Sequence, residues 1–402
     1  MNAPEPRRTD FSTVNYHEAV ARAEALVPAL RERAARAEGA SELSAENAAD
    51  LNHAGLMRIV QPKRWGGMGL DYTAAVEFPD IIGRGCMSTA WVLANLSIHH
   101  WMLALYEERA QEEVWGADPD AYIASGIAYP QGRGRFVDGG IELSGHWNFS
   151  SGVTVSTWNM LACVVREGDK VVDYRMCLVP MADYEIIDDW HVMGLKGTGS
   201  RSVKCDKIFV PEHRALSMLH HRKGQPYPGW AGNPETLFRI PFGGLAAHCI
   251  AGAVVGNAQA MLDAITGMIK ERSTSYTGLT MRDLNTVQAR IGLAGAQIDA
   301  ARLTLRNDCQ EAQRLTEEGI ELSLEHKLRQ KRNCAYAASL ATGAVDTLYA
   351  LAGANGLYTR GAMERIFRDQ HAAASHINFS MDAQTSAWGL ATLGGPIASA
   401  TL

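Results

Sequence analysis

Residues 193–214 read MGLKGTGSRSVKCDKIFVPEHR, a glycine-rich turn that leads into an apolar run and ends in a Val-Pro pair. The turn lacks the GxxxxGK[ST] order of a phosphate loop, and GRGRF at 132–136 lacks the GxGxxG turn of a dinucleotide site. Glycine turns that flank short apolar runs are typical of strands. The stretch therefore predicts a β-strand entered from a tight turn.

The same pattern of short apolar runs separated by turn segments extends towards the N-terminus to about residue 121. Short apolar runs recur there: YIASGIAY, GIELSGHWNFSSG, WNMLACVV and YRMCLVP. The segments PQGRGR, DGG and REGDK separate them, as turns separate antiparallel strands. The sequence predicts a small antiparallel β-barrel or β-sandwich.

Helical patterns lie on both sides of this β-region. Apolar residues recur at three- and four-residue steps in the N-terminal part, Ser44 is placed as an N-cap, and Gly55 follows as a stop signal. After the Pro/Gly-rich link 224–236, a candidate cover for a pocket, long helices return. One face of the first is marked by Val287, Ile291, Ala294, Ile298 and Leu305. We predict a mostly helical α+β protein: an N-terminal helical domain (1–118), a β-domain (119–217) and a C-terminal helical bundle (218–402).

Composition excludes several classes of function. The chain has 402 residues and a net charge of −6, without an arginine-rich run, which argues against binding nucleic acid. Its seven cysteines are scattered, with no CxxC pair, so we expect reduced thiols, no metal site and a cytoplasmic location. No apolar run approaches the roughly 18 residues of a membrane span, and the N-terminus lacks a signal-type apolar core. We expect no membrane association.

Four segments resemble the acyl-CoA dehydrogenase superfamily of flavoproteins. They are QPKRWGGMGLD (61–71), the stretch 193–214, LAGANGLY (351–358) and FRDQH (367–371). The resemblance implies a helical domain, a β-domain and a four-helix bundle, assembled as a homotetramer (a dimer of dimers).

An acyl-CoA dehydrogenase needs a carboxylate base to remove the α-proton of a thioester. The position that matches the usual glutamate is Arg360, and the less common placement falls near Ala246 or Ala247. Neither position holds a base, which argues against acyl-CoA oxidation. Glu364 lies nearby, so a dehydrogenase with an unusual base stays open as an alternative.

The segment GHWNFSSG (145–152) resembles instead the two-component flavin-dependent monooxygenases, which share this fold. The resemblance implies an oxygenase component that takes reduced FMN or FAD from a separate NAD(P)H:flavin reductase. It would react with O2 through a C4a-hydroperoxyflavin and hydroxylate a phenolic or indolic substrate.

The same resemblance assigns site residues. Ser151 matches a serine at flavin N5, His99 matches a histidine near the flavin, and His376 matches a histidine that accepts the proton of the substrate phenol. The remaining flavin-binding positions that it implies are Ser125, Trp147, Thr198 and Arg272.

Each of these residues also has an ordinary structural explanation. A serine pair in a turn usually caps the backbone, one of His99 and His100 is expected in the core, and Arg272 reads equally well as a surface arginine. A protein that kept the fold and lost the flavin is therefore a third reading.

Two details bear on the substrate. Phenol hydroxylases of this group commonly continue the SSG segment with Cys-Asp-His, whereas this chain has residues 153–155 as Val-Thr-Val. We expect a less polar pocket, which leaves indoles, fused rings and N- or S-oxygenated substrates open. His371 and His376 are five positions apart, about 140° around a helix, so they cannot form a zinc pair and only one faces a given pocket.

Overall fold

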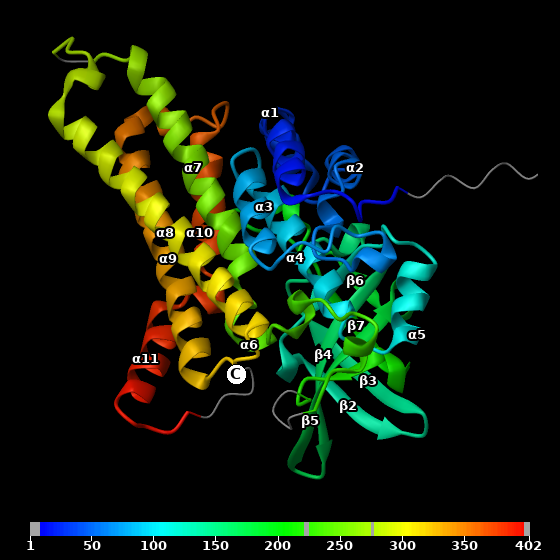
Figure 1. The fold of residues 1–402 in the computed structure, drawn as a ribbon. Helices are drawn as coiled ribbons and strands as arrows, with labels where there is room; N and C mark the ends of the chain where they lie inside the picture. The colour runs from blue at the N-terminus through cyan, green and yellow to red at the C-terminus, as the bar shows by residue number, and fades with distance from the viewer. Residues whose placement is uncertain (1–8, 221–224, 275–276, 398–402) are drawn as a thin grey trace, which may run out of the picture.

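The computed structural model describes residues 9–220, 225–274 and 277–397 (Figure 1). Helices, strands and helices follow one another along the chain, as predicted. The helices are α1 (Tyr16–Ala40), α2 (Ala45–His53), α3 (Ala74–Gly83), α4 (Met87–Leu103), α5 (Glu108–Gln111), α6 (Phe242–Leu245), α7 (His248–Glu271), α8 (Asn285–Glu317), α9 (Leu324–Ala352), α10 (Met363–Ala374) and α11 (Met381–Thr392). The strands are β1 (Ile123–Gly126), β2 (Gly132–Val137), β3 (Gly140–Trp147), β4 (Trp158–Glu167), β5 (Lys170–Pro180), β6 (Glu185–Ile187), β7 (Ser202–Pro211) and β8 (Ala215–Ser217). The boundaries at 118 and 217 stay a prediction.

The strands form one eight-stranded sheet with the order β6-β7-β3-β2-β4-β5-β8, and β1 pairs with β4. This path does not close into a barrel within the described residues. The expectation of a purely antiparallel sheet needs correction, because β1 and β2 both run parallel to β4. The hairpins β2–β3 and β4–β5 follow from their local turns. The parallel pairs depend instead on the longer connection 148–157, whose course no local signal specifies.

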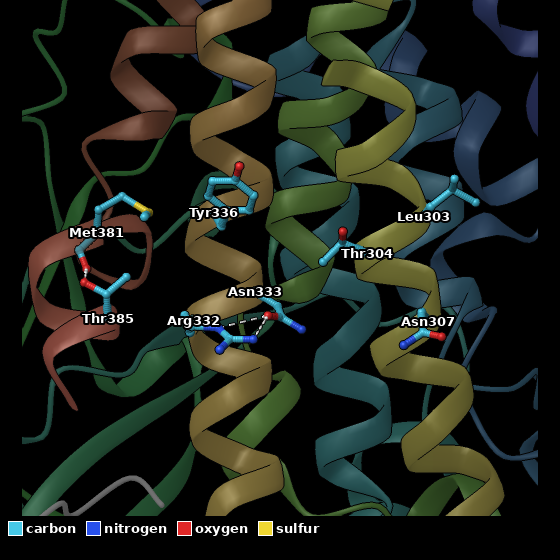
Figure 2. Close-up of a pocket in the computed structure, with 8 residues that line it drawn as sticks. All are labelled: Leu303, Thr304, Asn307, Arg332, Asn333, Tyr336, Met381 and Thr385. Atoms are coloured by element: carbon cyan, nitrogen blue, oxygen red, sulfur yellow. Dashed lines mark hydrogen bonds between the residues drawn. The ribbon is translucent and has the colours of Figure 1, made fainter. Parts of the chain in front are cut away.

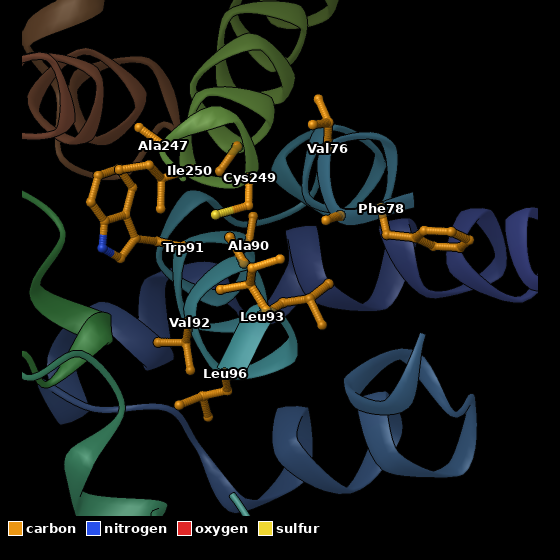
Figure 3. Packing of buried hydrophobic residues seen from close by; sticks show 14 of the residues in the cluster. Val76, Phe78, Ala90, Trp91, Val92, Leu93, Leu96, Ala247, Cys249 and Ile250 are labelled. Carbon is orange, nitrogen blue, oxygen red and sulfur yellow. The ribbon is translucent and has the colours of Figure 1, made fainter. Parts of the chain in front are cut away.

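Helix α4 lies between the N-terminal helices, the bundle and the sheet (Figure 1). It is apolar on all sides, and a helix of that kind is normally buried on all sides. Val92, Leu93 and Leu96 are fully buried. Figure 3 shows Val92 and Leu96 on the side of α4 that faces away from α3 and the start of α7, where they approach Gly152 of the Ser-Ser-Gly turn. Within α4 only Asn95 keeps appreciable accessible surface.

Helices α7 to α10 form the predicted bundle, and α11 packs against α9 (Figure 1). The predicted inner face of α8 is confirmed for Val287, Ala294, Ile298 and Leu305, while Ile291 is half-buried. The segment Gly243–Glu271 is long and apolar enough to cross a membrane, yet 83% of its apolar window is buried in the structure. It is therefore a core helix of the bundle.

The described part of the link 224–236 is fixed to the body of the protein. Asn233 is fully buried and donates to the carbonyl oxygen of Ala104 at 2.8 Å, while its own amide oxygen accepts from Arg64. Gly229 packs so closely that a β-carbon there would lie 2.0 Å from the same carbonyl oxygen. The link is anchored at the end of α4.

Candidate active site

Three segments far apart in the sequence meet at the indole of Trp91 on α4. Its Nε1 donates to Ser151 Oγ at 3.2 Å, and its ring meets the His376 imidazole edge-on, with the centroids 5.9 Å apart. Ala247 and Ile250, at the start of α7, lie on the Trp91 side of α4 (Figure 3). Ser151 and His376, which the sequence predicted separately, therefore share one neighbour.

Ser151 continues into a chain of hydroxyl groups in the glycine-rich turn. Ser151 Oγ lies 2.8 Å from Ser200 Oγ, which lies 2.7 Å from Thr198 Oγ1. Thr198 Oγ1 in turn donates to the carbonyl oxygen of Leu195 at 2.8 Å. The predicted residue Thr198 thus joins the cluster, whereas sequence reasoning missed both Ser200 and Trp91.

The Arg-Asp pair of α10 holds this turn in place. Asp369 Oδ1 accepts from the backbone N–H of Leu195 at 2.6 Å, and Leu195 adopts a left-handed conformation with φ of 56°. Burial raises the pKa of Asp369 to about 6, and the nearby Glu38 charge adds to the rise. Arg368 binds both carboxylate oxygens of Glu364 and the carbonyl oxygen of Met193. The bundle therefore positions the turn that carries the hydroxyl chain.

His99 and His100 have different partners. His99 Nδ1 donates to the carbonyl oxygen of Ile123 on β1 at 2.6 Å, two residues before Ser125. Burial lowers the pKa of His99 to about 4, so the ring is neutral at pH 7 and its Nε2 is an acceptor. His100 Nδ1 instead accepts from Trp115 Nε1 at 2.9 Å, and the two rings stack. His99 is the histidine tied to the β-domain, and His100 is the core histidine.

His376 is not in a helix, which corrects the geometric argument from the sequence. Helix α10 ends at Ala374, and His376 caps the short turn that follows by accepting from the N–H of Asn378 at 3.3 Å on Nδ1. Burial lowers its pKa to about 4. A neutral ring whose Nδ1 accepts carries its proton on Nε2, so in this state Nε2 is a donor, and the role of His376 as proton acceptor stays a prediction. His371 faces away and pairs with Asp346 on α9 at 2.9 Å.

Asn95 is a further residue that the sequence analysis did not select. It lies four residues from both Trp91 and His99, so the three share one stripe of α4. Its amide nitrogen donates to the carbonyl oxygen of Trp91 at 2.8 Å. A polar residue at this spacing in an apolar helix was a signal that could have been used.

The comparisons with known proteins agree with this geometry. Residues 18–117 match the family described as acyl-CoA dehydrogenase, N-terminal domain, and residues 248–381 match its C-terminal domain. The chain is 33% identical to the oxygenase subunit HsaA of a flavin-dependent monooxygenase from Rhodococcus jostii, over 94% of this chain and 98% of that protein. It belongs to the flavin-dependent monooxygenases.

Other members are similar over comparable lengths. The monooxygenase is 32% identical to the oxygenase component of an FADH2-dependent resorcinol hydroxylase from Rhizobium, over 98% of this chain and 97% of that one. A crystal structure of 3-HSA hydroxylase from Rhodococcus matches with a TM-score of 0.92 at 33% identity, covering 96% and 99% of the two chains. XiaF from Streptomyces, solved with FADH2, matches with a TM-score of 0.87 at 25% identity, covering 96% and 97%. The fold of an oxygenase component that uses reduced flavin and O2 is thereby established.

The polar groups of the cluster fit a reduced flavin. Ser151 is 8% exposed and uses its hydroxyl group within the cluster, and the neutral ring of His99, eight residues after Trp91 on α4, has an acceptor at Nε2. Acceptors suit the N–H groups that a flavin gains when it is reduced. Among the described residues, no group of three or more His, Cys, Asp or Glu side chains is placed to hold a metal ion.

Two predicted flavin contacts of the monooxygenase lie outside the cluster. Trp147 is fully buried in the sheet, where its Nε1 donates to the carbonyl oxygen of Ala162 at 2.7 Å, so it offers a cofactor no exposed surface here. Arg272 donates to the carbonyl oxygen of Ala352 at 2.8 Å and so caps α9. It follows the 24 residues of α7, which places it about 36 Å from the start of that helix beside Trp91.

A wide hollow of about 640 Å³ lies elsewhere, between α8, α9 and α11 (Figure 2). Its lining residues are Leu303, Thr304, Asn307, Arg332, Asn333, Tyr336, Met381 and Thr385. None of the predicted site residues lines it. We therefore assign the chemistry to the Trp91 cluster.

Proposed function

We propose that this monooxygenase hydroxylates an aromatic substrate, phenolic or indolic, with reduced flavin supplied by a separate NAD(P)H:flavin reductase. The observation that carries the proposal is the meeting of Ser151 and His376 at Trp91. Relatives include proteins named resorcinol hydroxylase, p-hydroxyphenylacetate 3-hydroxylase and indole-3-acetate monooxygenase. Their names refer to aromatic compounds.

The side chains around Trp91 divide the work. Bound reduced flavin supplies the electrons that activate O2. Ser151 would accept from an N–H group of that cofactor. The His376 Nε2–H would donate to the substrate oxygen and so favour a phenolic substrate that is bound already deprotonated, whose ring is electron-rich. The apolar side chains of Ala247 and Ile250 lie beside Trp91 and help to exclude water from the cluster (Figure 3). This wall favours an aromatic ring with little polar substitution beyond one oxygen or nitrogen.

The alternative of acyl-CoA oxidation finds no support in the geometry. Glu364 is held by both of its oxygens against Arg368, with the shorter contact at 2.6 Å, so it is not available as a free base. Alanine occupies the other base position at Ala247. The start of α7 therefore contributes a wall and not a proton acceptor.

An oxygen-labelling experiment tests the proposal. The purified chain would be combined with a flavin reductase, NADH, flavin, catalase and ¹⁸O2, and offered resorcinol, 4-hydroxyphenylacetate and indole-3-acetate. We expect a product with one ¹⁸O atom from at least one of them, and a loss of about 10²- to 10³-fold in the rate with His376→Ala, which removes the donor to the substrate oxygen. Consumption of NADH without any ¹⁸O-labelled product across the panel, together with flavin reduction by a short-chain acyl-CoA, would contradict the proposal.

We also propose that the protein is a homotetramer, a dimer of dimers, in the cytoplasm. Leu303 on α8 and Tyr336 on α9 are more than half exposed and line the hollow of Figure 2. A second subunit on this face would bury them. The distance of Arg272 from Trp91 is also consistent with an arginine that serves the flavin of a neighbouring subunit. Light scattering of Leu303→Glu should show smaller particles than the wild type, and an unchanged mass would count against this interface.

A further inference from the structure

A chain of four hydrogen bonds runs from Trp91 through Ser151, Ser200 and Thr198 to the carbonyl oxygen of Leu195. The four donor–acceptor distances are 3.2, 2.8, 2.7 and 2.8 Å. Each hydroxyl group has one proton to give and two lone pairs with which to accept. The direction of every bond in the chain therefore depends on its two ends.

Both ends are fixed by chemistry. The Trp91 indole N–H can only donate, and the Leu195 carbonyl oxygen can only accept. Thr198 must therefore spend its proton on Leu195, so it accepts from Ser200, and Ser200 in turn accepts from Ser151. Ser151 has then committed its only proton to Ser200 and one lone pair to Trp91. A single lone pair is left for a ligand.

Because these hydroxyl groups are buried, water cannot reverse the direction of the hydrogen bonds between them. Thr198 is fully buried, and Ser200 and Ser151 are nearly so. Hydrogen bonds in such surroundings are stronger than in water, and a hydroxyl turned the wrong way would leave a buried polar group unsatisfied. The polarity of Ser151 is therefore a property of the fold and not of the solvent.

We propose that Ser200 and Thr198 are positioning residues that make Ser151 Oγ an acceptor toward the flavin, and that this selects the reduced cofactor over the oxidised one. The inference rests on the proposed function and on the match of Ser151 to a serine at flavin N5. Reduced flavin carries a hydrogen on N5 and can donate to that lone pair. Oxidised flavin has only a lone pair on N5, so two acceptors would face each other.

Two substitutions remove the fixed polarity by different routes. In Ser200→Ala, the Ser151 proton has no partner in the turn and is free to point at the ligand. In Thr198→Val, Ser200 retains its hydroxyl but loses its acceptor, so it can donate to Ser151 and again release the Ser151 proton. Thr198→Ser keeps the hydroxyl and should behave like the wild type. Ser97→Ala, which removes a buried hydroxyl without a partner in the described structure, is the matched control on α4.

The measurement is anaerobic calorimetry with FMN and FAD, each in the oxidised and the reduced state, so no turnover is involved. We expect the ratio of the two dissociation constants, oxidised over reduced, to fall about 10-fold in Ser200→Ala and Thr198→Val. Most of the change should come from tighter binding of oxidised flavin. Thr198→Ser and Ser97→Ala should keep the wild-type ratio, with melting temperatures reported for all four.

The possible outcomes distinguish a failure of the proposed function from a failure of the role assigned to Ser200 and Thr198. Wild-type protein that binds neither state of flavin would refute the proposed function itself. A wild type that prefers reduced flavin, with a ratio unchanged within about twofold in both Ser200→Ala and Thr198→Val, would overturn the assignment of these two residues while leaving the function intact. A reduced ratio in the Ser97→Ala control would also overturn it, since that hydroxyl lies outside the chain.

Discussion

The buried carboxylate of Asp369 should make the protein less stable as pH rises, which is opposite to the usual effect of a carboxylate. It is 5% exposed, it accepts from the Leu195 N–H at 2.6 Å, and its pKa is raised to about 6 by burial and by the Glu38 charge. Because the pKa is higher in the folded state than the unfolded value near 3.8, the folded protein binds more protons between these two pH values. The free energy of unfolding therefore falls as pH rises through that window.

The size of the effect follows from the shift. A rise of about two pH units corresponds to roughly 3 kcal/mol between low pH and pH 7, and about half of it falls between pH 5 and 7.5. Asp369→Asn keeps an oxygen for the Leu195 N–H and removes the buried charge. We expect the variant to be at least as stable as the wild type at pH 7.5, and its stability relative to the wild type to increase by about 1–2 kcal/mol between pH 5 and 7.5.

The assay is urea unfolding followed by circular dichroism at the two pH values. Asp369→Leu serves as the control, because it removes the acceptor as well and should destabilise the protein by about 1–3 kcal/mol at both. If Asp369→Asn were as unstable at pH 7.5 as Asp369→Leu, the carboxylate charge itself would be stabilising, and the reasoning would be refuted.

Three further predictions concern other buried polar groups. His99→Asn keeps a donor to Ile123 but removes a group whose pKa is lowered to about 4 in the folded protein. Because of that lowered pKa, the wild type loses stability as pH falls below 6.5. In urea unfolding the variant should therefore lose about 1–2 kcal/mol less than the wild type between pH 6.5 and 5. Asp308 binds His248 at 3.1 Å in a fully buried pair. Asp308→Ala should therefore lower the free energy of unfolding by about 3–5 kcal/mol, and Asp308→Asn, which can still form a hydrogen bond, by less than half of that. Equal losses in the two variants would show that the hydrogen bond contributes little. Asn95→Leu should change the free energy of unfolding by less than about 1 kcal/mol but weaken binding of a phenolic substrate about 5- to 10-fold in calorimetry. Unchanged affinity would show that Asn95 does not contact the substrate.

Local signals were sufficient for much of the fold. The glycine turns gave the hairpins, and the apolar spacing of α8 gave its inner face, because both depend on residues close in the sequence. The parallel pairing of β1 and β2 with β4 was missed, because it depends on the route of a loop.

The site residues also fall into those that the sequence predicted and those that it did not. Ser151 and His376 were found through a resemblance, but the contacts of Trp91 and Ser200 with Ser151 join positions 60 and 49 residues apart. No spacing rule predicts such a contact. The end of α10 before His376 was also missed, because the sequence AAASHINFS contains no glycine or proline to announce it.

Rapid mixing tests the central claim most directly, namely that the protein activates O2 with externally reduced flavin at Ser151. The protein would be equilibrated anaerobically with reduced FMN or FAD, mixed with oxygenated buffer and followed by absorbance. We predict a transient spectrum that belongs to neither reduced nor oxidised flavin, with a lifetime shortened by Ser151→Ala. Direct appearance of oxidised flavin without a transient, under conditions in which calorimetry shows that reduced flavin is bound, would contradict the account.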